Sequence, residues 1–505
     1  MRGIKCVLSV SAVFILAACG GGGGGGGNPP PAPPAQNAPP TVSAGSDATA
    51  TLPSATVALT GSATDDGPAA SLTYQWSSAP ATGVTFSAPT AAASNVTFTT
   101  AGTYTLTLTV NDGTQPGTDT LSVVVSGAPA PAQNWPANDT NETDPFRGWA
   151  KVDAATVGMT QGGLDTAATF AQAVPATVRD PITNTTTGGA GMIVRRGQLV
   201  HSWGDIDRRQ SVKSVTKSMG GIVFGLAYDE DKFELSTTGV TLIGTFGTPP
   251  AENATPAQTV TIVQMATHTA GFDKDGGFAP MIPEGPGAAW KYSDAGLNWL
   301  ADVLTTVYQQ DLASLAQTRV WSVLGLNNGG TNTDDVLWRT NAQRPATRDG
   351  GTLQYRELAS GLDANVNAMA RVGLLFLRKG MWNGTRVLNE KFVDQVQTPL
   401  PENATLPVQT ERPGELFPDA ATDYGVLWWT NKSGTMPNVP SDTFWAWGLG
   451  EAIIVVIPSL DLVIVRNGGQ DTAGSTGRIW NDNDWDGDVR VLEGFLNPIV
   501  AATTP

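Results

Sequence analysis

Apolar and polar positions between Thr41 and Gly127 follow a pattern that predicts short β-strands. Thr103–Val110 alternates strictly between polar and apolar side chains and ends at the turn-forming Asn111–Gly113. Leu72–Trp76 gives an earlier strand with an aromatic side chain to bury. Turn residues separate these runs, which are rich in Thr, Val, Ser and Ala, so we expect an all-β sandwich over residues 41–127.

From Trp149 onward, strand-like and helix-like patterns are mixed. Two apolar hairpins are predicted, one within Gly191–Trp203 and one within Ala452–Val465. Helical periods lie between them, for example in Ala295–Tyr308 and Val366–Lys379. Strands at both ends that enclose a helical middle predict an α+β domain with an inserted helical subdomain.

The first residues predict an export signal. Arg2 and Lys5 give a positive start, Val7–Leu16 an apolar core, and Leu16–Cys19 a small-residue cleavage site. That tetrapeptide resembles a bacterial lipobox, which implies a signal peptide over residues 1–18 and lipid on Cys19. The alternative is a plain secretory signal with a chance cysteine.

Two segments are too rich in glycine or proline to form a packed core. Residues 19–40 contain Gly20–Gly27 and a proline-rich stretch, and they predict a tether. Residues 128–148 begin with a second Pro/Ala run and predict a linker. Gly20 after Cys19 resembles outer-membrane sorting of Gram-negative lipoproteins. We therefore expect a protein of the cell envelope, attached to the membrane only through its lipid.

Charge and cysteine content exclude several kinds of chemistry. The net charge is -16, and no basic patch is evident, so we expect no nucleic-acid partner. The chain has 2 cysteines. Cys6 would leave with the signal and Cys19 would carry lipid, so no thiol remains for a disulfide, a metal or a nucleophile.

One Ser-x-x-Lys sequence, Ser214–Lys217, is the main candidate for chemistry. On a helix, this spacing places the Ser214 hydroxyl and the Lys217 amine on one face, where the amine can act as the base of the hydroxyl. Lys213 would point elsewhere. The apolar run Ile222–Ala227 predicts a buried helix, with the pair near its N-terminal end, where the dipole favours developing negative charge.

Three motifs in a fixed order carry a family resemblance. Ser214–Lys217, then Tyr292–Asp294, then Ala446–Gly448 before a strand resemble serine hydrolases related to class C β-lactamases. That family includes penicillin-binding carboxypeptidases, esterases and 6-aminohexanoate-oligomer hydrolases. The resemblance covers about Val152–Leu496 and implies a β-lactamase-like α+β fold over residues 149–505, with an antiparallel sheet flanked by helices and an all-helical subdomain. Four further stretches agree with it: Thr267–Phe272 (with Ala270 for the serine of an H-T-S-G loop), Pro286–Gly287, Ser360–Leu362 and Met369–Arg371.

The resemblance implies acyl transfer in two steps, with no cofactor required. Ser214 would attack a carbonyl while Lys217 and Tyr292 share the proton transfers, and water would then release the acyl group. The backbone N–H groups of Ser214 and of Leu449, just after Gly448, would form the oxyanion hole. Read alone, Tyr292 is a half-buried tyrosine ahead of a helix.

The chain departs from the family pattern at Asp294, where the family usually has Asn. A carboxylate near Lys217 would raise the pKa of the amine and make it a poorer base, leaving more of that role to Tyr292. Alternatively, Asp294 points elsewhere as a helix N-cap.

A second departure concerns the substrate. The terminal-strand motif Phe444–Gly448 contains no cation, whereas β-lactamases and carboxypeptidases typically place Lys or His there. An apolar wall that includes Trp447 suits an uncharged ester or amide, because burying an unpaired carboxylate is costly. Arg466 on the next strand is an alternative cation, and Trp445 and Trp447 are alternatively core residues.

The β-sandwich resembles immunoglobulin-like domains of the polycystic-kidney-disease (PKD) type. The resemblance rests on Ala101–Tyr104 and Val110–Gly113. We expect the module to be a spacer, or a domain that contacts glycan or protein.

Three other features have alternative interpretations. Neither histidine is expected to be a catalytic base. We expect His268 to make a structural hydrogen bond and His201 to lie half-exposed on a strand. Residues 482–493 fit the spacing of a calcium loop or form an acidic loop before the last helix; the calcium would be structural, with the ligands Asp482, Asp484, Asp486 and Glu493.

The sequence as a whole predicts a lipid-anchored serine hydrolase of the cell envelope that acts on a small ester or amide. A true β-lactamase or D-alanyl-D-alanine carboxypeptidase is the alternative within enzymes. A catalytically inactive envelope binding protein is the alternative from another class.

Overall fold

The structure is a computed structural model with two compact units, residues 1–130 and 131–505. The structure describes residues 37–52, 55–66, 72–126, 134–138, 145–172, 189–244, 246, 256–274, 281, 284–326, 335–341, 353–409, 419–450, 452–467 and 489–504.

The first unit is a β-sandwich, as the alternating pattern predicts. One sheet has the strand order β2-β9-β8-β5, the second has the order β3-β7-β6, and β1 pairs with β4. The strands are β1 (Thr41–Ser43), β2 (Ala48–Thr51), β3 (Ala55–Thr60), β4 (Ser62–Thr64), β5 (Thr73–Ala79), β6 (Val84–Phe86), β7 (Ala93–Phe98), β8 (Gly102–Asn111) and β9 (Pro116–Ser126).

Alternation along β8 builds the core of the sandwich. Tyr104, Leu106, Leu108 and Val110 are buried, whereas the threonines between them face outward or are half-buried. Trp76 of β5 packs into the same core. The strict period of two therefore decided both the strand and its buried face.

The second unit is built on a six-stranded antiparallel sheet in the order β11-β10-β22-β21-β20-β19. Its strands come from the two ends of the domain sequence, and both predicted hairpins are present. The strands are β10 (Ala190–Arg195), β11 (Gln198–Trp203), β19 (Trp429–Thr430), β20 (Phe444–Gly448), β21 (Ala452–Ile457) and β22 (Leu462–Asn467).

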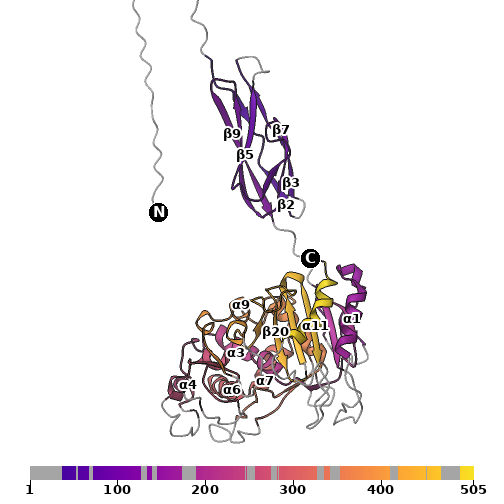
Figure 1. Cartoon of the computed structure of the whole chain (residues 1–505), viewed down its shortest axis with the longest axis vertical. Coiled ribbons are helices and arrows are strands. Elements are labelled where there is room, and N and C mark those ends of the chain that lie inside the picture. The colour runs from indigo at the N-terminus through magenta and orange to yellow at the C-terminus, as the bar shows by residue number, and fades with distance from the viewer. Residues whose placement is uncertain are drawn as a thin grey trace, which may run out of the picture. The chain divides into compact units, whose positions relative to one another are not determined.

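Both faces of this sheet are covered, which explains why β21 and most of β22 are apolar at successive positions. On one face, side chains such as Ile453 pack with the terminal helices α1 (Gln161–Gln172) and α11 (Val489–Ala501). On the other face, side chains such as Ile454 pack with α8 (Val366–Leu377) and the helical region. Figure 1 shows α1 and α11 on one side of the sheet and α3, α6 and α7 on the other.

The helical region lies between β11 and β19 in sequence. It contains α2 (Val215–Gly220), α3 (Ile222–Asp229), α4 (Gly239–Ile243), α5 (Ile262–Ala266), α6 (Asp294–Tyr308), α7 (Leu312–Ala316), α8, α9 (Glu390–Val396) and α10 (Ala420–Asp423). Small sheets join these helices: β12 (Gln210–Ser211) with β15 (Leu362–Ala364) and β14 (Val336–Trp338), β13 (Trp290–Lys291) with β18 (Val408–Gln409), and β16 (Met381–Trp382) with β17 (Thr385–Arg386).

These elements confirm the predicted α+β class with a helical subdomain. No helix in the described ranges combines the length and apolar character needed to cross a bilayer.

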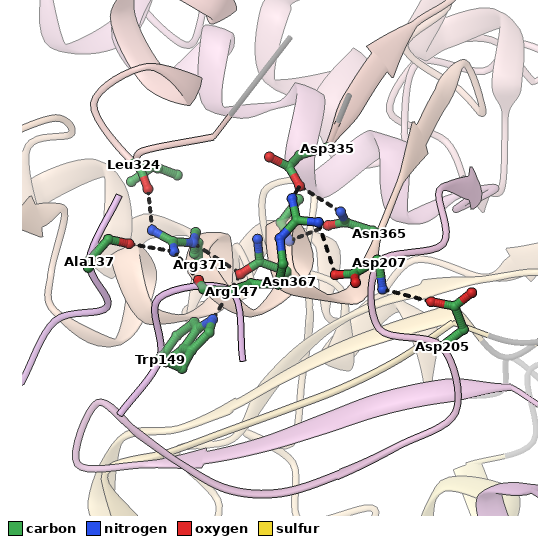
Figure 2. Close-up of polar contacts among 11 residues, drawn as sticks. Ala137, Arg147, Trp149, Asp205, Asp207, Leu324, Asp335, Asn365, Asn367 and Arg371 are labelled. Carbon is green, nitrogen blue, oxygen red and sulfur yellow. Dashed lines mark hydrogen bonds and ion pairs between the residues drawn. The ribbon is translucent and has the colours of Figure 1, made fainter. Parts of the chain in front are cut away.

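The described part of the segment that we expected to be a linker, 134–138 and 145–148, packs on the second unit. Figure 2 shows the buried guanidinium of Arg371 among backbone carbonyl groups of this segment and of the helical region. Arg371 donates hydrogen bonds to the carbonyl oxygens of Ala137, Arg147 and Leu324, each 2.7 Å long. The segment therefore supplies acceptors that a buried cation needs.

An arginine of the segment itself, Arg147, pairs with a buried carboxylate. Arg147 donates to Asp335, which is fully buried, at 2.9 Å and to Asp207 at 3.0 Å. Asn365, the N-cap of α8, donates to the same oxygen of Asp335 at 2.6 Å. This network fixes the start of α8, the helix that lies across the sheet.

Replacing Arg147 with alanine in the full chain should destabilise the second unit. The substitution breaks the buried ion pair with Asp335, and breaking a buried pair costs about 3–5 kcal/mol. Chemical denaturation followed by tryptophan fluorescence measures the loss.

The matched control is Arg319→Ala. Arg319 pairs with Glu230 at 2.7 Å, but its side chain is 45% exposed, so the expected loss is about 0–1 kcal/mol. Equal losses for the two variants would contradict a structural role for the Arg147 network.

Candidate active site

Ser214 lies at the N-terminal end of α2, after a strained turn. Lys213 has a φ of 51°, a left-handed conformation that is uncommon for lysine, and Ser214 follows as the N-cap residue of α2. The apolar face of α2 is buried against the core, through Val215 and Met219. The turn therefore delivers the Ser214 hydroxyl to the start of a helix that is fixed to the core.

Lys217 lies on the same face, as the spacing predicted, and its amine meets three acceptors. Nζ lies 3.0 Å from Ser214 Oγ, 2.7 Å from Asp294 Oδ1 and 2.8 Å from the carbonyl oxygen of Ala359. One of these acceptors is a carboxylate, which pairs with the charged form of the amine. The resting geometry is that of a charged Lys217.

The pKa of Lys217 agrees with this geometry. Burial alone would lower the pKa of the amine, but the charge of Asp294 and the hydrogen bond to it outweigh burial and raise the pKa above its usual value. The ion pair therefore holds Lys217 in the form that cannot accept a proton.

Tyr292 joins the pair from a distant part of the chain. It lies between β13 and α6, and its hydroxyl is hydrogen-bonded with both Ser214 and Lys217. Lys217 Nζ is 4.7 Å from the centroid of the tyrosine ring. Burial raises the pKa of Tyr292 and the neighbouring ammonium partly offsets that effect, so the phenol rests protonated at neutral pH. The structure thus brings Ser214, Lys217 and Tyr292 together.

Asp294 pairs with Lys217 and is not the N-cap of α6. Its carboxylate pairs with Lys217, whereas the N-cap of α6 is Ser293, whose hydroxyl accepts from the backbone N–H of Gly296 at 3.1 Å. Asp294 is the first residue of α6, where the helix dipole also favours a negative charge.

The end of β20 lies against the backbone of Ser214. A Cβ on Gly448 would lie 2.4 Å from the carbonyl oxygen of Val212 and 3.1 Å from the backbone nitrogen of Ser214, so only glycine fits this approach. Leu449 follows directly in the turn after the strand. Its place beside Ser214 is compatible with the predicted oxyanion hole, and its role stays a prediction.

Arg466 is not an exposed cation. It is fully buried in β22, where it donates to the carbonyl oxygens of Ala171 and Gly450, each at 3.1 Å. The second of these bonds holds the turn that contains Leu449. Arg466 thus supports the turn that follows β20.

The two tryptophans of β20 have different environments. Trp445 is buried in the core, whereas Trp447 is half-buried and packs edge-on against Trp429, with ring centroids 6.2 Å apart. Trp429 also contacts Tyr424 and Trp290, which adjoins Tyr292. We call these five rings, Trp290, Tyr292, Tyr424, Trp429 and Trp447, the aromatic cluster.

The structure also brings to the site two residues that sequence reasoning missed. The carbonyl of Ala359 receives a lysine hydrogen bond, although a backbone contact leaves no mark in the sequence beyond the neighbouring Ser360–Leu362 motif. Tyr424 packs against His268, whose ring lies on Tyr292. His201 lies half-buried on β11, as expected, beside Gln161.

Several predicted features lie outside the described residues. They are the signal peptide, Cys19, and the acidic stretch that contains Asp482, Asp484 and Asp486; Glu493 is described, half-buried in α11. In the described part of the chain, no three His, Cys, Asp or Glu side chains are grouped to hold a metal ion. Calcium binding stays a prediction.

Comparison with known proteins agrees with this geometry. The family model for β-lactamase matches residues 172–482, and a family model for a PKD domain matches residues 44–125. The chain therefore belongs to the β-lactamase family, and the predicted resemblance to this family and to PKD domains is confirmed. No curated protein matches the chain significantly.

Several solved structures are similar to the chain at low identity. A β-lactamase from Mycobacterium bovis is 17% identical, with a TM-score of 0.45, over 67% of this chain and 99% of its own. A penicillin-binding protein homologue from Caulobacter crescentus is 13% identical, with a TM-score of 0.47, over 68% and 98%. Simvastatin synthase from Aspergillus terreus is 14% identical, with a TM-score of 0.47, over 67% and 98%.

Asp294→Asn should lower the pKa of Lys217, because it removes the charge that raises this pKa and keeps the side-chain shape. The neutral amine is then populated at lower pH. The rate at which a fluorophosphonate labels Ser214 should rise with pH, and the variant should shift this rise to lower pH. On the rising limb, each unit of pKa corresponds to about a tenfold gain in rate at a fixed pH.

Asp273→Asn is the matched control. Asp273 pairs with Lys291 at 2.7 Å, and we expect no shift in this variant. An unchanged pH dependence in Asp294→Asn would show that the ionisation of Lys217 does not govern the reactivity of Ser214.

Proposed function

We propose that the chain is a serine hydrolase that cleaves a small ester or amide through an acyl-Ser214 intermediate. The observation that carries the proposal is the convergence of Lys217 and Tyr292 on one hydroxyl. Nucleophilic serines need such a neighbour to accept their proton. The strained turn and the buried helix that hold Ser214 give it the fixed position that nucleophilic attack requires.

The proposed reaction begins from protonated Lys217 and Tyr292. Loss of one proton from this coupled pair gives a base beside Ser214, and this base takes the proton of the Ser214 hydroxyl as its oxygen attacks the substrate carbonyl. The same pair returns the proton to the leaving alcohol or amine. Water next attacks the acyl-serine and gives a proton to the pair, which passes it to Ser214 Oγ as the acyl–serine bond breaks and the acid leaves. Because the resting pair is fully protonated, we expect activity to increase toward alkaline pH.

The aromatic cluster and the terminal strand favour an uncharged substrate. Trp447 presents a half-buried ring next to the strand end that adjoins Ser214. The strand Phe444–Gly448 carries no charged side chain, and the ammonium of Lys217 is already paired with Asp294. A substrate carboxylate at this strand would lose water without gaining a cation there. An ester or amide with an apolar acyl group meets no such penalty.

Ser214→Ala tests the proposal in the full chain. A fluorophosphonate probe should label the wild-type protein and fail to label Ser214→Ala, and the wild type should hydrolyse short-chain nitrophenyl esters. Ser218→Ala is the matched control, because Ser218 lies one turn further along α2 and donates to the carbonyl of Leu427. A wild type that is neither labelled nor active would support the inactive binding protein.

A panel of nitrophenyl esters beside nitrocefin separates the two enzymatic candidates. We expect ester hydrolysis to exceed nitrocefin hydrolysis. Rapid nitrocefin turnover without ester activity would support a β-lactamase or a D-alanyl-D-alanine carboxypeptidase instead.

We also propose that the protein is a lipid-anchored component of the cell envelope. The support is the positively charged start, the short apolar core and the lipobox-like tetrapeptide that ends at Cys19. Cys19→Ala, expressed in a Gram-negative host, should lose the lipid and leave the membrane fraction. Retention of the variant with the membranes after a carbonate wash would contradict the anchor.

A further inference from the structure

His268 is a buried histidine for which the proposed reaction has no direct use. It follows α5 in the His-Thr-Ala-Gly loop, and its side chain is 1% exposed. Its φ of 60° lies in the left-handed region, which histidine enters more readily than most residues. A buried polar ring in an unusual backbone conformation needs a structural reason.

Three consecutive residues of the tyrosine-bearing segment are bound to His268. The backbone N–H of Lys291 donates to the carbonyl oxygen of His268 at 2.8 Å. The backbone N–H of Ser293 donates to Nδ1 of the imidazole at 3.1 Å. Between these bonds, the ring of Tyr292 stacks on the imidazole, with centroids 4.4 Å apart and planes 26° apart.

Regular secondary structure gives this segment little support, although Asp273 also contacts it through Lys291 and Ser293. Strand β13 is only two residues long, Trp290–Lys291, and it pairs with the equally short β18. Tyr292 itself belongs to neither β13 nor α6, which begins at Asp294. The contacts with His268 therefore fall where the secondary structure is interrupted.

The environment of His268 encloses the imidazole and keeps it neutral. Tyr424 packs against the ring at 4.8 Å and Trp290 at 5.6 Å, so the imidazole is enclosed by aromatic side chains. Burial, together with the nearby charge of Lys217, holds the pKa of His268 well below its usual value. The neutral ring keeps Nδ1 as an acceptor, which the hydrogen bond from Ser293 requires.

We propose that His268 is a positioning residue, which holds the phenol of Tyr292 against Ser214 and Lys217. The inference rests on the proposed function, because it gives Tyr292 its place in the reaction. His268 supplies one backbone acceptor, one side-chain acceptor and one stacking surface to residues 291–293. It exchanges no proton with the substrate.

Two variants of the full chain separate these contributions. His268→Asn retains an acceptor at the position of Nδ1 and tolerates the left-handed backbone, but it loses the stacking ring. His268→Phe retains a ring but leaves the Ser293 N–H without its acceptor. Displacement of a catalytic group by about 1 Å costs on the order of 100-fold in rate. We expect kcat/KM for a nitrophenyl ester to fall about 100-fold in His268→Phe and about 10-fold in His268→Asn, through kcat and not KM.

A double-mutant cycle tells positioning from general damage to the fold. If His268 acts through Tyr292, each His268 substitution should change kcat/KM by less than about threefold in a Tyr292→Phe background, because the group to be positioned is gone. Effects of equal size in both backgrounds would overturn the proposal. His201→Phe, at the other histidine of the chain, is the control and should leave kcat/KM unchanged.

Crystal structures of the two variants provide a readout that needs no activity. The phenol of Tyr292 should leave Ser214 in His268→Phe and stay nearer to it in His268→Asn. A phenol that remains hydrogen-bonded to Ser214 in both variants would overturn the positioning role even if the wild type is inactive. Absence of labelling in the wild type, in contrast, would contradict only the proposed hydrolase function.

Discussion

The site depends on one buried ammonium group. Lys217 is 2% exposed, and its donors reach Ser214, Asp294 and Ala359, which lie in three separate parts of the chain. A buried charge without acceptors is costly, so the meeting of these segments at one point stabilises the folded domain. The same interaction that assembles the site also keeps the lysine charged. Reactivity at Ser214 is therefore coupled to the pH at which this assembly loses a proton.

Close backbone packing also holds Ser214, the neighbour of the ammonium. Gly448 brings the end of β20 against the backbone of Ser214, and Arg466 holds the following turn through the carbonyl of Gly450. Elsewhere in the second unit, Arg371 and Arg147 attach the segment before the domain to α8, which packs on the same sheet. Buried cations bonded to carbonyl and carboxylate oxygens thus recur as the means of fixing irregular segments. The regular elements are held instead by their apolar faces.

Much of the fold followed from local pattern. The alternation of Thr103–Val110 became β8, and the period of Ala295–Tyr308 became α6 with one further residue at its start. The Ser-x-x-Lys spacing placed Ser214 and Lys217 together because a helix fixes the relation of residues three apart. The order of the motifs indicated Tyr292 as their partner through family resemblance. These inferences succeeded because each depends on neighbours in sequence or on a recognisable series of motifs.

Other features were decided only by tertiary structure. Whether Asp294 caps a helix or pairs with Lys217 depends on a contact between residues 77 positions apart. Trp445 and Trp447 look equivalent in sequence and share one face of the sheet, but Trp445 is the more deeply buried, because β19 pairs with β20 at Phe444 and Trp445 and does not reach Trp447. The stacking of His268 on Tyr292 likewise joins separate loops. Sequence specifies what each residue can do chemically and its local conformation, whereas the three-dimensional packing of distant segments determines which groups become its partners.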